Sequence, residues 1–168
     1  MKLKKEEYNM ELVKKDEIVP KKREETALAS QKTATIVTFY MGNFLLGIPA
    51  EKVMEINKEI DITPVPLSNE HILGIMNLRG QVIPVIDLAK KLSIDLKVTP
   101  KLNLIVKDEE ETLVSFVIEE IGEILEILPA KLEKTPDKLE GIAKEYIKNV
   151  YQLPDRLLLI LDIEKIIR

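Results

Sequence analysis

Residues 74–88 read GIMNLRGQVIPVIDL and carry the strongest structural signal in the chain. Gly80 can adopt backbone angles that are closed to other residues, so it provides a pivot for a bend just after Arg79. An almost continuously apolar strand follows and ends at Asp87, whose carboxylate can cap a short helix. This arrangement displays or pairs the guanidinium of Arg79, and it therefore indicates docking and not a chemical step.

The chain repeats this plan. A hairpin at residues 36–48 turns at Gly42-Asn43, and a second hairpin at 102–118 turns through an acidic loop. The segment Val53-Met54-Glu55-Ile56 is matched by Ile121-Gly122-Glu123-Ile124, 68 residues later (53 to 121). The closing strand before Asp87 is matched by residues 157–161 before Asp162, 75 residues later (87 to 162). The sequence thus predicts a duplicated β unit.

We expect an all-β fold of two SH3-like five-stranded barrels, arranged pseudo-symmetrically around a shared apolar core. Each repeat is too small to bury a good core alone, so each is expected to close its own sheet and pack on its twin. Asp87 and Asp162 are the predicted caps of two short helices. Residues 121–128 fit a helical face as well as a strand, and the repeat favours a strand. Pro84 predicts either an edge strand or a bulge, and an open edge near it would be available to a partner.

Two regions are expected along the chain. Residues 1–32 are rich in Lys and Glu, which predicts a flexible, disordered tail, with a fraying helix as the alternative. Residues 33–168 are expected to form one domain of two intertwined β-barrel subdomains.

Composition narrows the possible functions. The 168 residues are 45% apolar, carry a net charge of −4 and contain no cysteine, so neither disulfides nor thiolate chemistry is available. Nucleic acid is not an expected partner, because a net charge of −4 predicts no broad basic face and aromatic residues are only 4% of the chain. No apolar run approaches the roughly 20 residues that cross a bilayer, and no signal peptide is evident, so we expect a cytoplasmic protein without direct membrane insertion.

Catalytic groups are scarce. The single histidine, His71, has no second histidine with which to build a relay or metal site, and we expect a structural or solvent role for it. The densest carboxylate set is Glu119, Glu120, Glu123 and Glu126. These glutamates are predicted to form a solvated face, with a carboxylate-dependent hydrolase as the enzyme alternative. We assign no catalytic residue, metal or cofactor.

Arg79 has two interpretations from its chemistry alone. It can form an internal bidentate ion pair with Glu55 on the nearby strand. It can also recognise a partner, with Glu55 setting the orientation of the guanidinium. The two interpretations are compatible. A further alternative for the whole chain is a β-barrel assembly module that self-associates through the edge at Pro84.

The residues from about Thr35 to Arg168, about four fifths of the chain, resemble the CheW-type coupling proteins of bacterial chemotaxis. The resemblance rests on four segments in the same order: VMEI at 53–56, GIMNLRG at 74–80, VIPVIDL at 82–88 and RLLLILDI at 156–163. Two positions depart from the family pattern, which often has aspartate where Glu119 stands and glycine where Ser115 stands.

This resemblance implies a non-catalytic adaptor that joins the cytoplasmic tips of methyl-accepting chemoreceptors to the regulatory domain of the CheA histidine kinase, recruited to membrane-associated receptor arrays. It implies two SH3-like barrels and a monomer in isolation. Carried over by position, Val53, Glu55 and Arg79 are expected at or beside the receptor-binding groove between the subdomains, with Gly74 and Gly80 shaping its turns. No receiver-like domain follows, which argues against the longer CheV-type coupler.

Overall fold

The structure, a computed structural model, describes residues 32–58, 61–66 and 68–168. Its internal contacts divide the chain after Thr33, and every element below belongs to the unit Ala34–Arg168. The tail predicted at residues 1–32 lies, apart from Lys32, outside the described residues.

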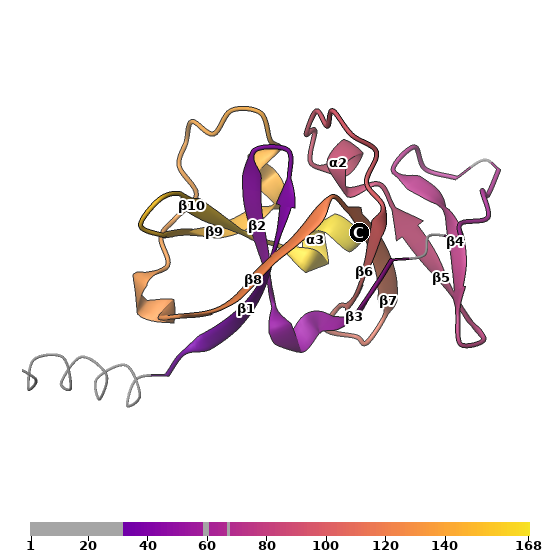
Figure 1. Cartoon of the computed structure of the whole chain (residues 1–168), viewed down its shortest axis with the longest axis horizontal. Helices are drawn as coiled ribbons and strands as arrows, with labels where there is room; N and C mark the ends of the chain where they lie inside the picture. Colours follow the sequence, from indigo (N-terminus) through magenta and orange to yellow (C-terminus); the bar gives the residue numbers. More distant parts are fainter. Residues whose placement is uncertain (1–31, 59–60, 67) are drawn as a thin grey trace, which may run out of the picture. The chain divides into compact units, whose positions relative to one another are not determined.

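Two five-stranded sheets make up the unit (Figure 1). The first has the order β8-β1-β2-β10-β9 and consists of β1 (Ala34–Met41), β2 (Phe44–Pro49), β8 (Glu120–Ile127), β9 (Ile147–Gln152) and β10 (Leu157–Leu161). The second has the order β3-β6-β7-β5-β4 and consists of β3 (Val53–Asn57), β4 (Ile72–Leu78), β5 (Gln81–Ile86), β6 (Leu102–Lys107) and β7 (Leu113–Ile118). We call them barrel 1 and barrel 2. The fold class predicted from the sequence is confirmed.

Helical structure within the described residues is short. It consists of α2 (Leu88–Lys91), α3 (Ile163–Ile167) and the 3₁₀ turns η1 (Ala50–Lys52), η2 (Pro129–Lys131) and η3 (Lys144–Tyr146). Both predicted caps are present. Asp87 Oδ1 accepts a hydrogen bond from the Lys90 backbone N–H at 3.1 Å, and Asp162 Oδ1 accepts one from Lys165 at 3.2 Å. These bonds satisfy a backbone donor at the start of each helix.

The two barrels have the same topology but do not coincide with the two sequence repeats. Barrel 2 is continuous in sequence from β3 to β7, whereas barrel 1 joins the first hairpin to the last three strands. Matched strands therefore exchange places: β3 borders the hairpin β6–β7, and β8 borders the hairpin β1–β2. The expectation that each repeat closes its own sheet is wrong.

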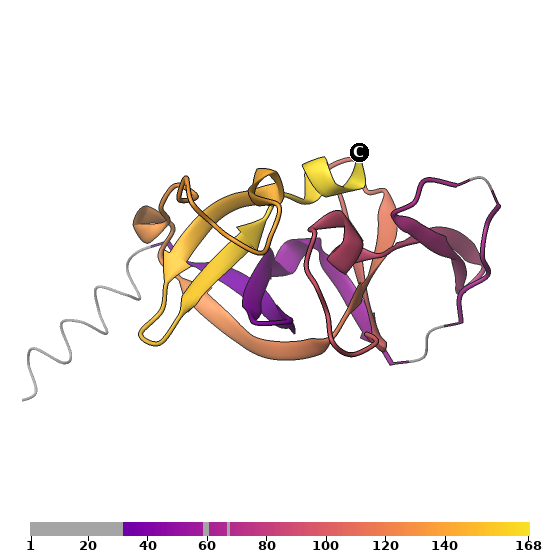
Figure 2. The ribbon, with the colours of Figure 1, turned by 90° about the horizontal axis from the view of Figure 1, so that it is seen from above.

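One core is shared by the barrels. It includes Phe39 and Leu46 from barrel 1 together with Leu104 and Phe116 from barrel 2, all fully buried. Alternate side chains of the same strands face smaller cores inside each barrel, such as that around Leu158. The strands β1, β2, β6 and β7 are buried on both faces, which explains their near-continuous apolar sequences. In both views α3 lies where the two sheets meet (Figures 1 and 2).

Two local expectations have different outcomes. Residues 120–127 form strand β8, as the repeat favoured. Pro84 does not lie on an edge strand, because β5 is between β4 and β7. Its missing N–H is accommodated because the ladder from β5 to β7 begins only at Val85, one residue later.

Ser115, a departure from the family pattern, is fully buried and donates a hydrogen bond to Asn103 Oδ1 at 2.9 Å.

Candidate functional site

The predicted partners Glu55 and Arg79 meet in the structure. Arg79 Nη2 lies 2.7 Å from Glu55 Oε2, with the arginine side chain 75% exposed and the glutamate side chain 26% exposed. Glu55 lies on β3, which is one edge strand of the sheet of barrel 2. Arg79 lies in the turn between β5 and β4, and β4 is the opposite edge strand. The ion pair thus joins two ends of the sheet of barrel 2. Because the guanidinium is mostly exposed, its other donors remain accessible to a partner.

The turn that carries Arg79 holds an unusual backbone conformation. Arg79 has φ 50° and Gly80 has φ 87°, and both are positive, as a two-residue type I′ loop requires. The Gly80 N–H donates to Asn77 Oδ1 at 2.7 Å and fixes the start of the loop. A positive φ disfavours most side chains, so the arginine is held in a strained position at the tip of a hairpin.

Gly74 has a different requirement from Gly80. Its φ is 155°, and a Cβ at this position would overlap the carbonyl oxygen of Thr63. That close approach exists because Thr63 and Ile75 exchange backbone hydrogen bonds of 2.8 and 2.9 Å. No atom lies within 4 Å of the Cβ position at Gly80. Gly74 therefore allows the segment at Thr63 to lie close by, whereas Gly80 serves only the turn.

Val53 lies two residues before Glu55 and contacts the shared core. It begins β3, is half-buried and packs against core residues of both barrels. The next outward-facing side chains on β3, Met54 and Ile56, are 50% and 42% exposed, and Val82 at the start of β5 is 59% exposed. Exposed aliphatic side chains therefore accompany the ion pair on both β3 and the hairpin β4–β5, a feature typical of contact surfaces. We call Val53, Glu55 and Arg79 with these three residues the barrel 2 surface.

The matched position on barrel 1 is arranged differently. Glu123 on edge strand β8 matches Glu55, and Arg156 lies in the turn before β10. Arg156 stacks over the ring of Tyr40 at 5.3 Å and lies 3.6 Å from Asp155, and it is not paired with Glu123. Glu123 and Arg156 line a cleft of about 620 Å³. Ile121 and Ile124 beside them are 38% and 68% exposed.

Glu119 and His71 make separate local contacts. Within residues 32–58, 61–66 and 68–168, no group of three or more His, Asp or Glu side chains is placed to hold a metal ion. Glu119 accepts a hydrogen bond from the Gly42 N–H at 2.7 Å and so fixes the first hairpin turn. His71 Nδ1 is buried without a partner, and its Nε2 lies 3.9 Å from Glu70. None of the described helices is long and apolar enough to span a membrane.

One polar contact near the barrel junction was not predicted from the sequence. Glu164 on α3 accepts from Lys52 Nζ at 3.2 Å and from the Glu109 N–H at 3.1 Å. It therefore ties η1, the turn between β6 and β7, and α3 together next to Val53. No sequence pattern connects these three segments, which lie 112 and 55 residues apart along the chain.

Comparison with known proteins decides the family. A family model for the CheW-like domain matches residues 35–168. The chain belongs to the CheW-like family. The sequence resemblance to the CheW-type coupling proteins is thereby confirmed.

Individual relatives agree with this assignment. The chain is 31% identical to the chemotaxis protein CheW of Thermotoga maritima over 138 residues, which cover 81% of this chain and 89% of the relative. It is 29% identical to the chemotaxis protein CheW of Treponema pallidum, with 78% and 80% covered. The crystal structure of the scaffolding protein TtCheW from Thermoanaerobacter tengcongensis matches with a TM-score of 0.71 and 28% identity, with 78% and 90% covered.

Proposed function

We propose that this CheW-like domain is a non-catalytic adaptor, which couples chemoreceptor tips to the regulatory domain of a CheA-type histidine kinase within receptor arrays. The observation that carries the proposal is a pair of matched barrels on one rigid core, each with its own exposed aliphatic edge strand. Separate surfaces on a single folded body allow two partners to bind at once. The adaptor needs no cofactor and is a monomer in isolation.

The receptor is assigned to the barrel 2 surface. A receptor helix would lay aliphatic side chains against Met54 and Ile56, beside the point where Val53 enters the shared core. Arg79 would meet a carboxylate or carbonyl of that helix, because its guanidinium is exposed and held in one orientation by Glu55. Gly74 and Gly80 shape the hairpin that presents Arg79.

The kinase is assigned to barrel 1. Strand β8 is the edge of its sheet and displays Ile121 and Ile124 to solvent. A barrel of similar shape in the kinase regulatory domain would pack on this edge. Signalling then requires that the two receptor states favour different placements of the kinase, because a ligand shifts an equilibrium only through its differential contacts.

The experiment compares the two surfaces with matched variants. Arg79→Ala and Glu55→Ala should each weaken binding to a purified receptor-tip fragment about tenfold and leave binding to the kinase regulatory domain unchanged. Arg156→Ala, which removes an arginine from the matched turn of barrel 1, should leave receptor binding intact. Ile124→Glu should weaken binding to the kinase regulatory domain and leave receptor binding unchanged.

Two results would contradict the assignment. Receptor binding that is unchanged in both Arg79→Ala and Glu55→Ala would remove the receptor from the barrel 2 surface. Loss of kinase binding in these same variants, with receptor binding retained, would reverse the two assignments. Circular dichroism of each variant separates a binding defect from unfolding.

A further inference from the structure

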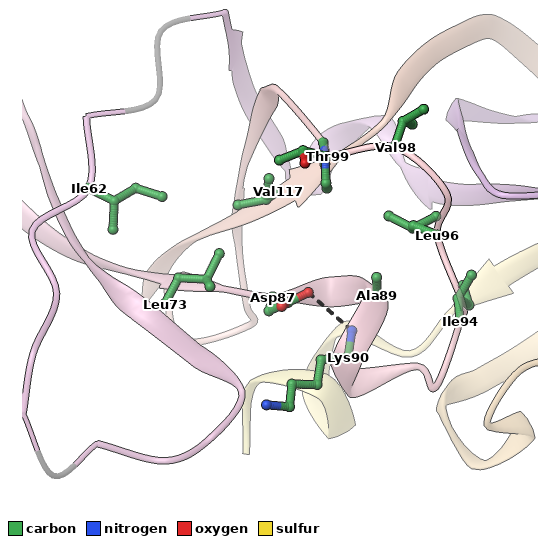
Figure 3. A pocket seen from close by; sticks show the side chains of 11 residues that line it. Ile62, Leu73, Asp87, Ala89, Lys90, Ile94, Leu96, Val98, Thr99 and Val117 are labelled. Carbon is green, nitrogen blue, oxygen red and sulfur yellow. Dashed lines mark hydrogen bonds between the residues drawn. The ribbon is translucent and has the colours of Figure 1, made fainter.

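Barrel 2 has an open cleft that the adaptor function does not use. Its volume is about 590 Å³, and it lies between α2, the loop that follows α2, and strand β4 (Figure 3). Most of its lining side chains are aliphatic, and they include Ile62, Leu73, Ala89, Leu96, Val98 and Val117. Val53, Glu55 and Arg79 do not line it. The cleft is therefore separate from the barrel 2 surface.

The rim of the cleft is exposed and aliphatic. Leu73 is 39% exposed and Val98 is 55% exposed, whereas Ala89 and Val117 in the cleft are buried. A hollow with a buried floor and an exposed aliphatic rim has the features of a contact surface. The volume is large enough for a long side chain of a partner.

One carboxylate gives the cleft a charge preference. Asp87 lines it, and one carboxylate oxygen accepts the capping hydrogen bond from the Lys90 N–H. Among the described residues, no Lys, Arg or His side chain forms an ion pair with Asp87. Lys90 also lines the cleft, and Figure 3 shows its ammonium group pointing away from Val98, Thr99 and Val117. Asp87 thus has no ion-pair partner in a largely aliphatic cleft, whose other charged lining residue is Lys90.

We propose that this cleft receives an arginine or lysine side chain that a partner polypeptide presents between aliphatic residues. The aliphatic stem of such a side chain packs on apolar walls while its charged end remains polar. Pairing with a cation compensates the negative charge of a partly desolvated carboxylate. An acidic or purely aliphatic segment fits the same volume but leaves Asp87 unpaired, so charge complementarity selects a basic segment.

The chain contains a matched control for Asp87. Asp162 caps α3 through the same kind of hydrogen bond, at the matched position of the repeat, and does not line the cleft. Asparagine caps helices as well as aspartate does, so Asp87→Asn and Asp162→Asn remove one charge each and keep both helices. Val98→Ser tests the aliphatic rim at an exposed position.

The experiment is a titration of the full ¹⁵N-labelled chain with two blocked pentapeptides, acetyl-ALRLA-amide and acetyl-ALELA-amide, followed by amide chemical shifts. The arginine peptide should shift the amides of Leu73, Ala89 and Val98, and the glutamate peptide should not. Binding should weaken about tenfold in Asp87→Asn, weaken in Val98→Ser and stay unchanged in Asp162→Asn.

Four outcomes would overturn the proposal. Equal shifts with both peptides, or an unchanged affinity in Asp87→Asn, would remove the charge preference. No shift at the cleft amides would remove the site. Movement of the same amides on simple dilution of the chain, without peptide, would assign the cleft to a second copy.

Discussion

Arg79, in the turn between β4 and β5, is expected to contribute to receptor binding and not to the stability of the fold. Arg79 has φ 50°, which glycine adopts without strain. Arg79→Gly should therefore leave the free energy of unfolding unchanged or raise it by up to about 1 kcal/mol, because the exposed ion pair with Glu55 adds little. The same variant should lose receptor binding. Urea unfolding and receptor pull-down measure the two effects, and a clear loss of stability would mean that the arginine is structural.

Replacing the two glycines of the predicted site by alanine should lower the free energy of unfolding by different amounts. Gly74→Ala places a methyl group against the carbonyl of Thr63, so the free energy of unfolding should fall by at least about 2 kcal/mol. Gly80→Ala meets no atom within 4 Å and should cost only the backbone penalty of about 1 kcal/mol. Equal losses for both variants in urea unfolding would contradict the close approach at Thr63.

At the scale of elements, the short helices depend on their caps. α3 has only five residues, so its formation relies on Asp162 and on the burial of Ile163 and Ile166. Asp162→Ala should lower the free energy of unfolding by about 1 kcal/mol, and Asp162→Asn should stay close to the parent chain. Thermal unfolding of both variants checks this expectation. A loss in Asp162→Asn as large as that in Asp162→Ala would indicate that the charge matters and not the cap.

Elements were more predictable from the sequence than their partners. The hairpins, the capped helices and strand β8 follow from local turn residues, alternation and the repeat. The exchange of β3 and β8 does not, because matched strands have similar sequences and local pattern does not specify which hairpin each one borders. Pro84 was predicted on an edge strand for the same reason. Whether a strand inside the sheet can contain a proline depends on where its pairing with β7 begins, which local sequence does not specify.

The candidate site shows the same limit. Glu55 and Arg79 were paired from charge and bidentate chemistry, and the ion pair is present. The bonds from Lys52 and Glu109 to Glu164 escaped prediction, because they join elements that meet only in the folded chain. The receptor-binding role of the predicted residues stays a prediction.

At the scale of the whole molecule, the shared core should make both barrels unfold together. Phe116 belongs to barrel 2 but is fully buried among side chains of both barrels. Phe116→Ala should lower the free energy of unfolding by about 3–5 kcal/mol and reduce amide protection in β1 and β2 as much as in β6 and β7. Ile124→Ala, at an exposed position, is the control and should change little. Two separate transitions would contradict a single cooperative unit.

The central claim, that one folded body joins two macromolecules through separate surfaces, is tested most directly by co-sedimentation. Receptor tips assembled on vesicles are mixed with the kinase, with and without the full chain, and kinase activity is measured in the same pellet. The account predicts that the kinase sediments and changes its activity only when the chain is present, and that Arg79→Ala reduces both effects. Sedimentation and activity that are the same without the chain would contradict it.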